Sequence, residues 1–224
     1  MTARSAADYR HLAGRFIVLE GIDGSGTTTQ AQRLVAVLAR AGLGARFTCE
    51  PSGGPHGRQI RQLLAPSSDP VSRSWDALAL LFAADRLDHV AREIRPALDS
   101  GGTVICDRYD LSSLAYQSAT APAGVDPVPW IRAINQRALR PDLTLVLDVD
   151  PDVAEARRAQ RAQPAEIFEQ RDLQRRLAQL YARAEKLVPG DRVLHIRAES
   201  SVDEVGAQIL QAISTNLLPP EVLQ

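Results

Sequence analysis

Residues 15–28 read RFIVLEGIDGSGTT, and this stretch decides the fold of the chain. Its first six residues, Arg15 to Glu20, form a short apolar run that predicts a buried strand. The next eight, Gly21 to Thr28, match the phosphate-binding pattern G-x-x-x-x-G-K-[ST] at every fixed position except the lysine. Apolar residues then recur at helical spacing over residues 27–41. Strand, glycine loop and helix in this order predict that loop N–H groups and a helix N-terminus hold a phosphate group.

The rest of the chain alternates apolar, strand-like runs with stretches of helical periodicity. Further strands are expected at residues 45–49, 103–106, 143–148 and 192–196. Further helices are expected at residues 55–65, 75–98, 128–139, 152–161, 168–188 and 202–217. This alternation predicts an α/β fold with a mainly parallel five-stranded sheet flanked by helices.

The domain organisation is expected to be simple. No linker rich in Pro, Gly and Ser divides the sequence, so residues 15–218 are predicted to form one domain. Residues 1–14 are interpreted as an N-terminal extension, either frayed or folded into a short extra helix. Residues 219–224 are interpreted as a C-terminal tail.

Composition narrows the function classes. The 26 basic and 27 acidic residues give a formal net charge of -1, which argues against a bulk polyelectrolyte partner such as nucleic acid. The two cysteines, Cys49 and Cys106, do not make a disulfide framework. No apolar run reaches the ~18 residues of a membrane span, and the first 14 residues lack the apolar region of a signal peptide. We therefore expect a cytoplasmic protein without a membrane partner.

The phosphate-binding loop departs from its pattern at one position. Thr27 stands where the lysine that contacts the nucleotide phosphates is usual, whereas Thr28 keeps the hydroxyl that ligates Mg²⁺. Removing one such preorganised donor costs about 3 kcal/mol of transition-state stabilisation. Lys186 is the only lysine in the sequence, so a compensating charge is expected from arginine.

Five segments together show a resemblance to a known family. From about Arg15 onward, the sequence resembles the bacterial thymidylate kinases, with a loop that lacks the usual lysine. The segments that carry the resemblance are EGIDGSGTTTQ at 20–30, EPSGG at 50–54, LFAADRLDH at 81–89, DRYDLSSLAYQ at 107–117 and RPDLTLVLD at 140–148. The family implies a P-loop nucleoside-monophosphate-kinase-like fold and the reaction ATP + dTMP → ADP + dTDP, with Mg²⁺ as cofactor and ATP and dTMP as the bound partners.

The resemblance also assigns roles to individual residues. It implies that ATP binds the loop residues Gly21, Ile22, Asp23, Gly24, Ser25, Gly26, Thr27 and Thr28. It implies that dTMP contacts Glu50, Phe82, Arg86, Arg108, Ser112, Tyr116 and Gln117, with Phe82 stacking on thymine and Arg86 donating to a base oxygen. Thr28 would ligate the metal, and Asp107 would orient Arg108 or a metal-bound water. Phe82 and Arg86 share a helix face, and the alternative is that Phe82 is a core side chain and Arg86 a solvated or salt-bridged one.

Catalysis in this family is positioning and charge neutralisation. The residues expected to provide it are Asp23, Arg108, Arg157, Arg158 and Arg161, the last three in a lid around residues 157–170. Non-basic residues stand at three positions where the family is usually basic, namely Thr27, Cys49 and Ile167.

Two other functions therefore remain open at this point. One is a kinase for another nucleoside monophosphate, such as a different pyrimidine. The other is a nucleotide-binding homologue with weak or lost kinase activity. The resemblance further implies a homodimer formed through long helices such as residues 75–98.

Overall fold

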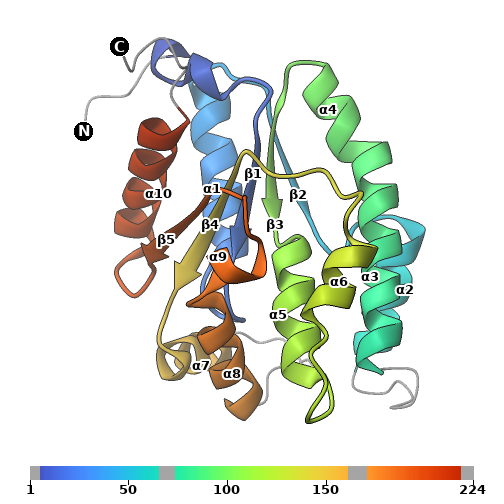
Figure 1. Cartoon of the computed structure of the whole chain (residues 1–224). Helices are drawn as coiled ribbons and strands as arrows, with labels where there is room; N and C mark the ends of the chain where they lie inside the picture. Colours follow the sequence, from blue (N-terminus) through green and yellow to red (C-terminus); the bar gives the residue numbers. More distant parts are fainter. Residues whose placement is uncertain (1–5, 66–73, 161–170, 218–224) are drawn as a thin grey trace.

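A computed structural model describes residues 6–65, 74–160 and 171–217 of the chain (Figure 1). Its centre is a sheet of five parallel strands in the order β2-β3-β1-β4-β5. The strands are β1 Phe16–Glu20, β2 Ala45–Cys49, β3 Thr103–Asp107, β4 Leu143–Asp148 and β5 Val193–Arg197. The predicted α/β fold with a five-stranded parallel sheet is confirmed.

Helices cover both faces of this sheet (Figure 1). They are α1 Thr27–Arg40, α2 Pro55–Leu64, α3 Trp75–His89, α4 Arg95–Asp99, α5 Asp110–Thr120, α6 Val128–Ile134, α7 Pro151–Ala159, α8 Arg171–Tyr181, α9 Ala184–Leu187 and α10 Val202–Asn216. A 3₁₀ helix, η1, covers Ala6–Leu12, and a π-helix, η3, covers Val90–Ile94 between α3 and α4. Helices α1 and α10 pack together on one face, and α5 packs with α8 and α9 on the other.

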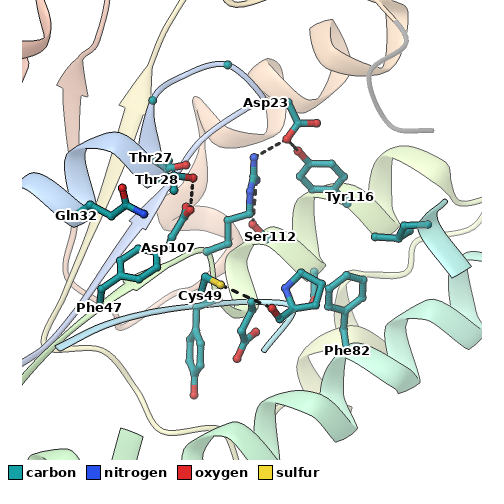
Figure 2. A pocket seen from close by; sticks show the side chains of 18 of the residues that line it. Asp23, Thr27, Thr28, Gln32, Phe47, Cys49, Phe82, Asp107, Ser112 and Tyr116 are labelled. Atoms are coloured by element: carbon teal, nitrogen blue, oxygen red, sulfur yellow. Dashed lines mark hydrogen bonds and ion pairs between the residues drawn. The ribbon is translucent and has the colours of Figure 1, made fainter. Parts of the chain in front are cut away.

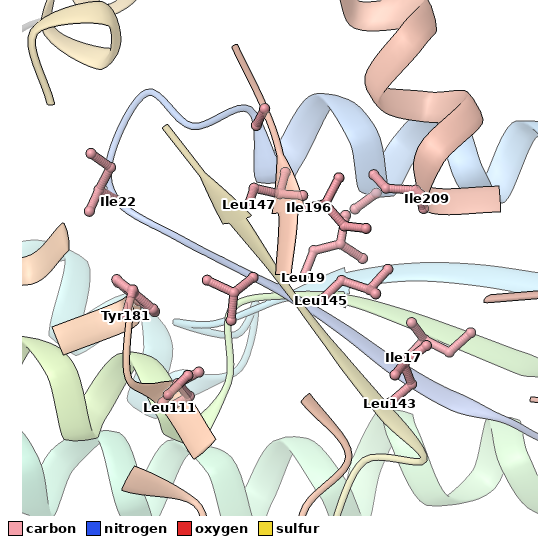
Figure 3. Close-up of a cluster of buried hydrophobic side chains, with 14 of the residues drawn as sticks. Ile17, Leu19, Ile22, Leu111, Leu143, Leu145, Leu147, Tyr181, Ile196 and Ile209 are labelled. Atoms are coloured by element: carbon pink, nitrogen blue, oxygen red, sulfur yellow. The ribbon is translucent and has the colours of Figure 1, made fainter. Parts of the chain in front are cut away.

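Strand β1 lies at the centre of the core. Ile17 and Leu19 belong to the larger hydrophobic cluster, whereas Phe16 and Val18 pack into a second cluster. Side chains of a strand alternate between faces, so a strand covered on both faces reads as a continuous apolar run. Figure 3 shows the larger cluster gathering around β1 and β4, with Ile209 of α10 approaching from above the sheet.

The parallel order of the strands places the predicted site residues at one end of the sheet. In a parallel sheet every strand points the same way, so the turns that follow β1, β2 and β3 open at the same end. These turns carry the phosphate-binding loop, Glu50 and Asp107-Arg108. Segments far apart in sequence therefore meet at the carboxyl ends of three adjacent strands.

Some expected elements differ in the structure. The helix expected over 75–98 is divided into α3, the π-helix η3 and α4, and the helix expected over 168–188 is described as α8 and α9. The sequence did not predict α5, because nearly all of its residues are buried and it lacks the polar face that gives a helical periodicity.

The N-terminal extension and the tail have different outcomes. Residues 6–12 form η1, and Tyr9 and Leu12 are buried in the main core cluster. The tail at 219–224, residues 161–170 of the expected lid and Ile167 lie outside the described residues. No helix in the described ranges is long and apolar enough to cross a bilayer.

Candidate active site

A cavity of about 410 Å³ opens at the carboxyl ends of β1, β2 and β3 (Figure 2). Most of the predicted site residues line it. They are Asp23, Gly24, Gly26, Thr27, Thr28, Glu50, Phe82, Asp107, Arg108, Ser112, Tyr116, Gln117 and Arg158. Gly21, Ile22, Ser25, Arg86 and Arg157 are described but do not line it, and Arg161 lies outside the described residues.

Two glycines of the phosphate-binding loop, residues 21–28, adopt backbone conformations that other residues rarely take. Gly24 has φ +92°, and a Cβ atom at this position would lie 2.5 Å from the carbonyl oxygen of Ala154 in α7. Gly26 has φ +98° and is the N-cap of α1. Because glycine offers no capping side chain, the first N–H groups of α1 stay available to a bound anion.

The two threonines at the end of the loop, Thr27 and Thr28, differ in their surroundings. Thr27 is buried and lines the cavity, whereas Thr28 is exposed and donates a hydrogen bond to Oδ2 of Asp107 (Figure 2). Asp107 is itself buried, and its Oδ1 has no partner among the described residues. A threonine hydroxyl beside a carboxylate oxygen with free acceptor capacity fits Mg²⁺, which takes few protein ligands and keeps water and phosphate oxygens for the rest.

A different kind of metal site, formed by protein side chains alone, would need a cluster of ligating residues in the described ranges. They contain no group of three or more His, Cys, Asp or Glu side chains that could hold an ion on their own.

Arg108 and Asp23 form the central ion pair of the cavity. Nη2 of Arg108 lies 2.6 Å from Oδ1 of Asp23, and the hydroxyl of Tyr116 donates to the same oxygen at 2.8 Å (Figure 2). Nη1 of Arg108 donates to the carbonyl oxygen of Gly21 at 2.8 Å. The guanidinium thus lies against the phosphate-binding loop.

The backbone of Arg108 is unusual. It is the only non-glycine residue of the described chain with a positive φ, at +68°. This left-handed conformation is costly for a residue with a Cβ atom and occurs where the surroundings impose it, often at functional sites. It carries the chain from β3 into α5 and turns the Arg108 side chain toward Asp23.

Electrostatics keeps this pair in its charged form. Burial is the largest single effect and lowers the pKa of the Arg108 guanidinium, but Tyr116, Asp23, Tyr181 and Asp107 together outweigh it, and the net result is a pKa well above the usual value. Burial also raises the pKa of the Tyr116 phenol well above its usual value, so it stays protonated and donates to Asp23. The site therefore presents a permanent cation beside the loop.

Arg86 lies behind the cavity, in a buried ion pair. Its Nη2 lies 2.6 Å from Oε2 of Glu50 and 3.1 Å from the hydroxyl of Ser113, and its Nη1 donates to Asn135. Burial is the largest single effect and lowers the pKa of Arg86, but Glu50, Asp110 and Tyr109 together raise it by more, so the guanidinium stays charged. Arg86 is 1% exposed and does not line the cavity, so its contact with a base remains a prediction.

The far part of the cavity combines an aromatic ring with unsatisfied polar atoms. Phe82 of α3 is half-buried and borders a small cluster formed by Ile60, Leu64 and Leu78. Across the cavity, Gln117 of α5 is 1% exposed, and its Oε1 has no partner in the described ranges. A ring face and a buried amide edge are the groups that recognise a flat, neutral heterocycle.

The two described lid arginines point to different places. Arg158 of α7 lines the cavity, and its Nη1 donates to the backbone oxygen of Asp23. Arg157 instead donates to the backbone oxygen of Glu199 at 3.3 Å, away from the cavity. Of the two, Arg158 brings charge to the loop that lacks a lysine.

Several residues of this site were not found by sequence reasoning. Glu20, Asn135, Gln174 and Tyr181 all make hydrogen bonds to predicted site residues. A signal for Glu20 was available, because an acid at the end of an apolar strand is unusual. Gln174 and Tyr181 lie on α8 and Asn135 follows the end of α6, and none of the three belongs to a local motif.

Glu20 is the buried acid that joins these elements. Its carboxylate accepts hydrogen bonds from the backbone N–H groups of Tyr109 and Ser112, from the Ser112 hydroxyl and from the Tyr181 hydroxyl. Burial raises the pKa of Glu20 to about 7, although the bonds from Ser112 and the charge of Arg108 oppose this rise.

The fold and the cavity together define a class of protein. A phosphate-binding loop after β1, an arginine after β3 that faces this loop, and a cavity for a flat heterocycle beside them are the parts of a P-loop nucleoside monophosphate kinase. The comparisons with known proteins agree with this class and identify one family within it. A family model described as thymidylate kinase matches residues 19–209, and the chain belongs to the thymidylate kinase family.

Curated relatives cover nearly the whole chain. It is 40% identical to a probable thymidylate kinase of Pyrococcus abyssi over 209 residues, which are 92% of this chain and 99% of that protein. It is 39% identical to the thymidylate kinase of Rhizorhabdus wittichii over 213 residues, 93% of this chain and 100% of that protein. The thymidylate kinase of Symbiobacterium thermophilum is 40% identical over 203 residues, 88% of this chain and 92% of that protein.

The raised pKa of Glu20 predicts a pH-dependent stability. Protonation is favoured in the folded state, so the stability it contributes is fully present below the usual pKa of 4.5 and is lost as the pH rises through about 7. The slope in this window is at most about 1.4 kcal/mol per pH unit. Chemical denaturation of the wild type and Glu20→Gln should show the wild type losing stability relative to the variant between pH 5 and 7. A difference that stays constant over this range would contradict the assignment.

Proposed function

We propose that this protein transfers the γ-phosphoryl group of ATP to dTMP, forming ADP and dTDP, and that it does so in the cytoplasm. The observation that carries the proposal is the Arg108–Asp23 pair, which holds a charged guanidinium between the phosphate-binding loop and the cavity lined by Phe82 and Gln117. The relatives named above carry the same activity in their names.

The acceptor in this reaction needs no general base. A phosphate monoester has its second pKa near ~6, so the attacking oxygen is already ionised at pH 7. The work left to the protein is to bring two negatively charged phosphates together and to stabilise the charge of the transferring group. The backbone N–H groups of the loop would hold the ATP phosphates, and Arg108 would bind the dTMP phosphate through two N–H groups.

Mg²⁺ would be held by the Thr28 hydroxyl and, through water, by the Asp107 carboxylate. When bound, the ion neutralises phosphate charge during transfer.

Arg158 is the proposed substitute for the missing loop lysine. Its guanidinium donates to the backbone of the loop at Asp23 and borders the cavity beside Thr27. A guanidinium can contact two phosphate oxygens at once, whereas an ammonium acts as a compact point charge. We propose that Arg158 meets the transferring phosphoryl group from the side of α7, opposite Arg108.

Two residues are proposed to select the base. Phe82 would stack on the thymine ring, and Gln117 would bond its polar edge with the Oε1 atom that has no partner in the described chain. Arg86 holds Glu50 and Ser113 behind the cavity, and its proposed contact with a base oxygen requires its guanidinium to move toward dTMP.

A homodimer through α3 is also proposed. Leu80, Ala84 and Leu87 of α3 are exposed and lie at spacings of four and three residues, so they share one side of the helix. Leu80 is 52% exposed and Leu87 is 44% exposed, which is a large apolar exposure on a single helix face. A second copy of the same stripe would cover it around a two-fold axis.

The assay of the function is ADP release with ATP, Mg²⁺ and a panel of monophosphates. We expect turnover with dTMP, and at least tenfold lower kcat/KM with dCMP and with dGMP, because Gln117 and Phe82 fit a thymine. Turnover with a purine monophosphate above that with dTMP would show that the base pocket is assigned wrongly. Binding of dTMP without turnover would favour a homologue that has lost kinase activity.

The same assay tests the loop through Thr27→Lys. An added ammonium at a cavity-lining position should raise kcat about tenfold, less than the roughly 10²-fold effect of a single donor, because Arg158 already supplies charge. The control is Thr29→Lys, which adds the same charge two residues further along α1 at an exposed position. Equal effects of the two variants would contradict a phosphate contact at position 27.

The dimer is tested by Leu80→Glu combined with Leu87→Glu. Opposing carboxylates in the stripe should repel, so light scattering should give twice 24.3 kDa for the wild type and 24.3 kDa for the variant. Val202→Glu is the control, since Val202 is 46% exposed but lies on α10. A monomeric wild type, or a variant that stays dimeric, would contradict the proposed interface.

A further inference from the structure

Gln174 is a polar side chain on the buried face of α8. It is 0% exposed and lies among Leu173, Leu177 and Tyr181, which are also buried. A buried amide is costly unless its donor and acceptor are both satisfied. The sequence around it contains no motif, and the reaction described above assigns it no role.

The carboxamide of Gln174 satisfies both requirements on one residue of the phosphate-binding loop. Its Oε1 accepts a hydrogen bond from the backbone N–H of Asp23 at 3.1 Å, and its Nε2 donates to Oδ2 of Asp23 at 2.8 Å. The two bonds match the donor and acceptor edge of the amide. They tie α8 to a residue 151 positions away in sequence.

The other oxygen of Asp23 is the one that holds Arg108. Oδ1 takes Nη2 of Arg108 at 2.6 Å and the Tyr116 hydroxyl at 2.8 Å (Figure 2). The Asp23 carboxylate is therefore held from both sides, by Gln174 on one oxygen and by Arg108 and Tyr116 on the other. Rotation of the carboxylate would break all three bonds.

Helix α7 also contacts the phosphate-binding loop, at Asp23 and Gly24. The carbonyl oxygen of Ala154 lies against Gly24, and Arg158 donates to the backbone oxygen of Asp23. Helices α7 and α8 are joined to each other, because Arg171 bridges to Asp152 at 2.8 Å and to Glu155 at 3.2 Å. The two helices thus form one unit that contacts Asp23 and Gly24.

We propose that Gln174 is a positioning residue that fixes the Asp23 carboxylate and, through it, the Arg108 guanidinium in the orientation that receives the acceptor phosphate. This inference rests on the proposed function. Without the Nε2 donor, Oδ2 of Asp23 loses its partner in α8, and the carboxylate is held at Oδ1 by Arg108 and Tyr116. Arg108 then keeps its charge and its bond to the Gly21 carbonyl, but its direction is fixed less firmly, which weakens acceptor binding and slows transfer.

The first test compares Gln174→Met with Gln179→Met. Methionine nearly preserves the size of glutamine and removes both hydrogen bonds, and Gln179 is an exposed residue of the same helix. We expect Gln174→Met to lower kcat/KM for dTMP about tenfold, the effect of losing a hydrogen bond to a charged group, with KM for ATP changed less than twofold. Gln179→Met should match the wild type.

The second test uses Gln174→Glu, which separates positioning from packing. The ionised variant keeps an acceptor for the Asp23 N–H but opposes the Asp23 carboxylate with a like charge, whereas the protonated variant restores the donor. Arg108, Tyr116 and Arg158 face this position through Asp23. Glu20, with a pKa of about 7, accepts a hydrogen bond from Tyr181 of the same helix, and its titration is common to the wild type and both variants, so it cancels in the activity ratio. The activity of Gln174→Glu relative to wild type should rise at least fivefold from pH 8 to pH 6, while that of Gln174→Met relative to wild type stays level.

The outcomes separate this inference from the proposed function. If the wild type turns over dTMP and Gln174→Met matches Gln179→Met, the positioning role is wrong and the function stands. The positioning role is also overturned if the activity of Gln174→Glu relative to wild type does not depend on pH. It is likewise overturned if Gln174→Met loses kcat/KM equally for dTMP and ATP and has a lower melting temperature. If the wild type neither binds nor phosphorylates dTMP, the proposed function fails. If it binds dTMP without turnover, calorimetric titration should still show about tenfold weaker dTMP binding in Gln174→Met.

Discussion

The ion pair between Arg108 and Asp23 is the interaction on which the rest of the site depends. It joins the loop after β1 to the turn after β3, and it requires a left-handed backbone at Arg108 that is unfavourable in isolation. Parallel pairing of β1 with β3 brings the two turns together, and Tyr116, Gln174 and the Gly21 carbonyl hold the two side chains in place. Strain at one residue is thus supported by contacts from α5, α8 and the loop after β1.

The site also shows how a chain with one lysine can build a phosphate-binding cavity. Positive charge at the cavity comes from Arg108 and Arg158, which approach from β3 and α7, and both contact the loop itself. The position usually taken by lysine is a buried threonine. We therefore propose that the charge a lysine would supply from within the loop comes from outside it, so that α7 and the turn after β3 must be held firmly against the loop.

Patterns within single segments of the sequence predicted the elements that form from neighbouring residues. The strand, loop and helix from Arg15 to Arg40 follow from apolar pattern and glycine spacing, and the resemblance to a known family placed Phe82, Arg108, Tyr116 and Gln117 around one cavity. Helix α5 escaped prediction because burial on nearly all sides removed its periodicity. The position of Arg86 behind Glu50, with Asn135 as a further acceptor, and the contact of Gln174 with Asp23 depend on residues that are distant in sequence, and no pattern within a single segment encodes them.

The central claim is that Arg108, held by Asp23, binds the phosphate of the acceptor nucleotide. Calorimetric titration of dTMP and of thymidine into the wild type and Arg108→Met tests it most directly, because the two ligands differ only in that phosphate. The account predicts that the variant loses at least tenfold in affinity for dTMP and less than twofold for thymidine. Equal losses for both ligands, or no loss for dTMP, would contradict it.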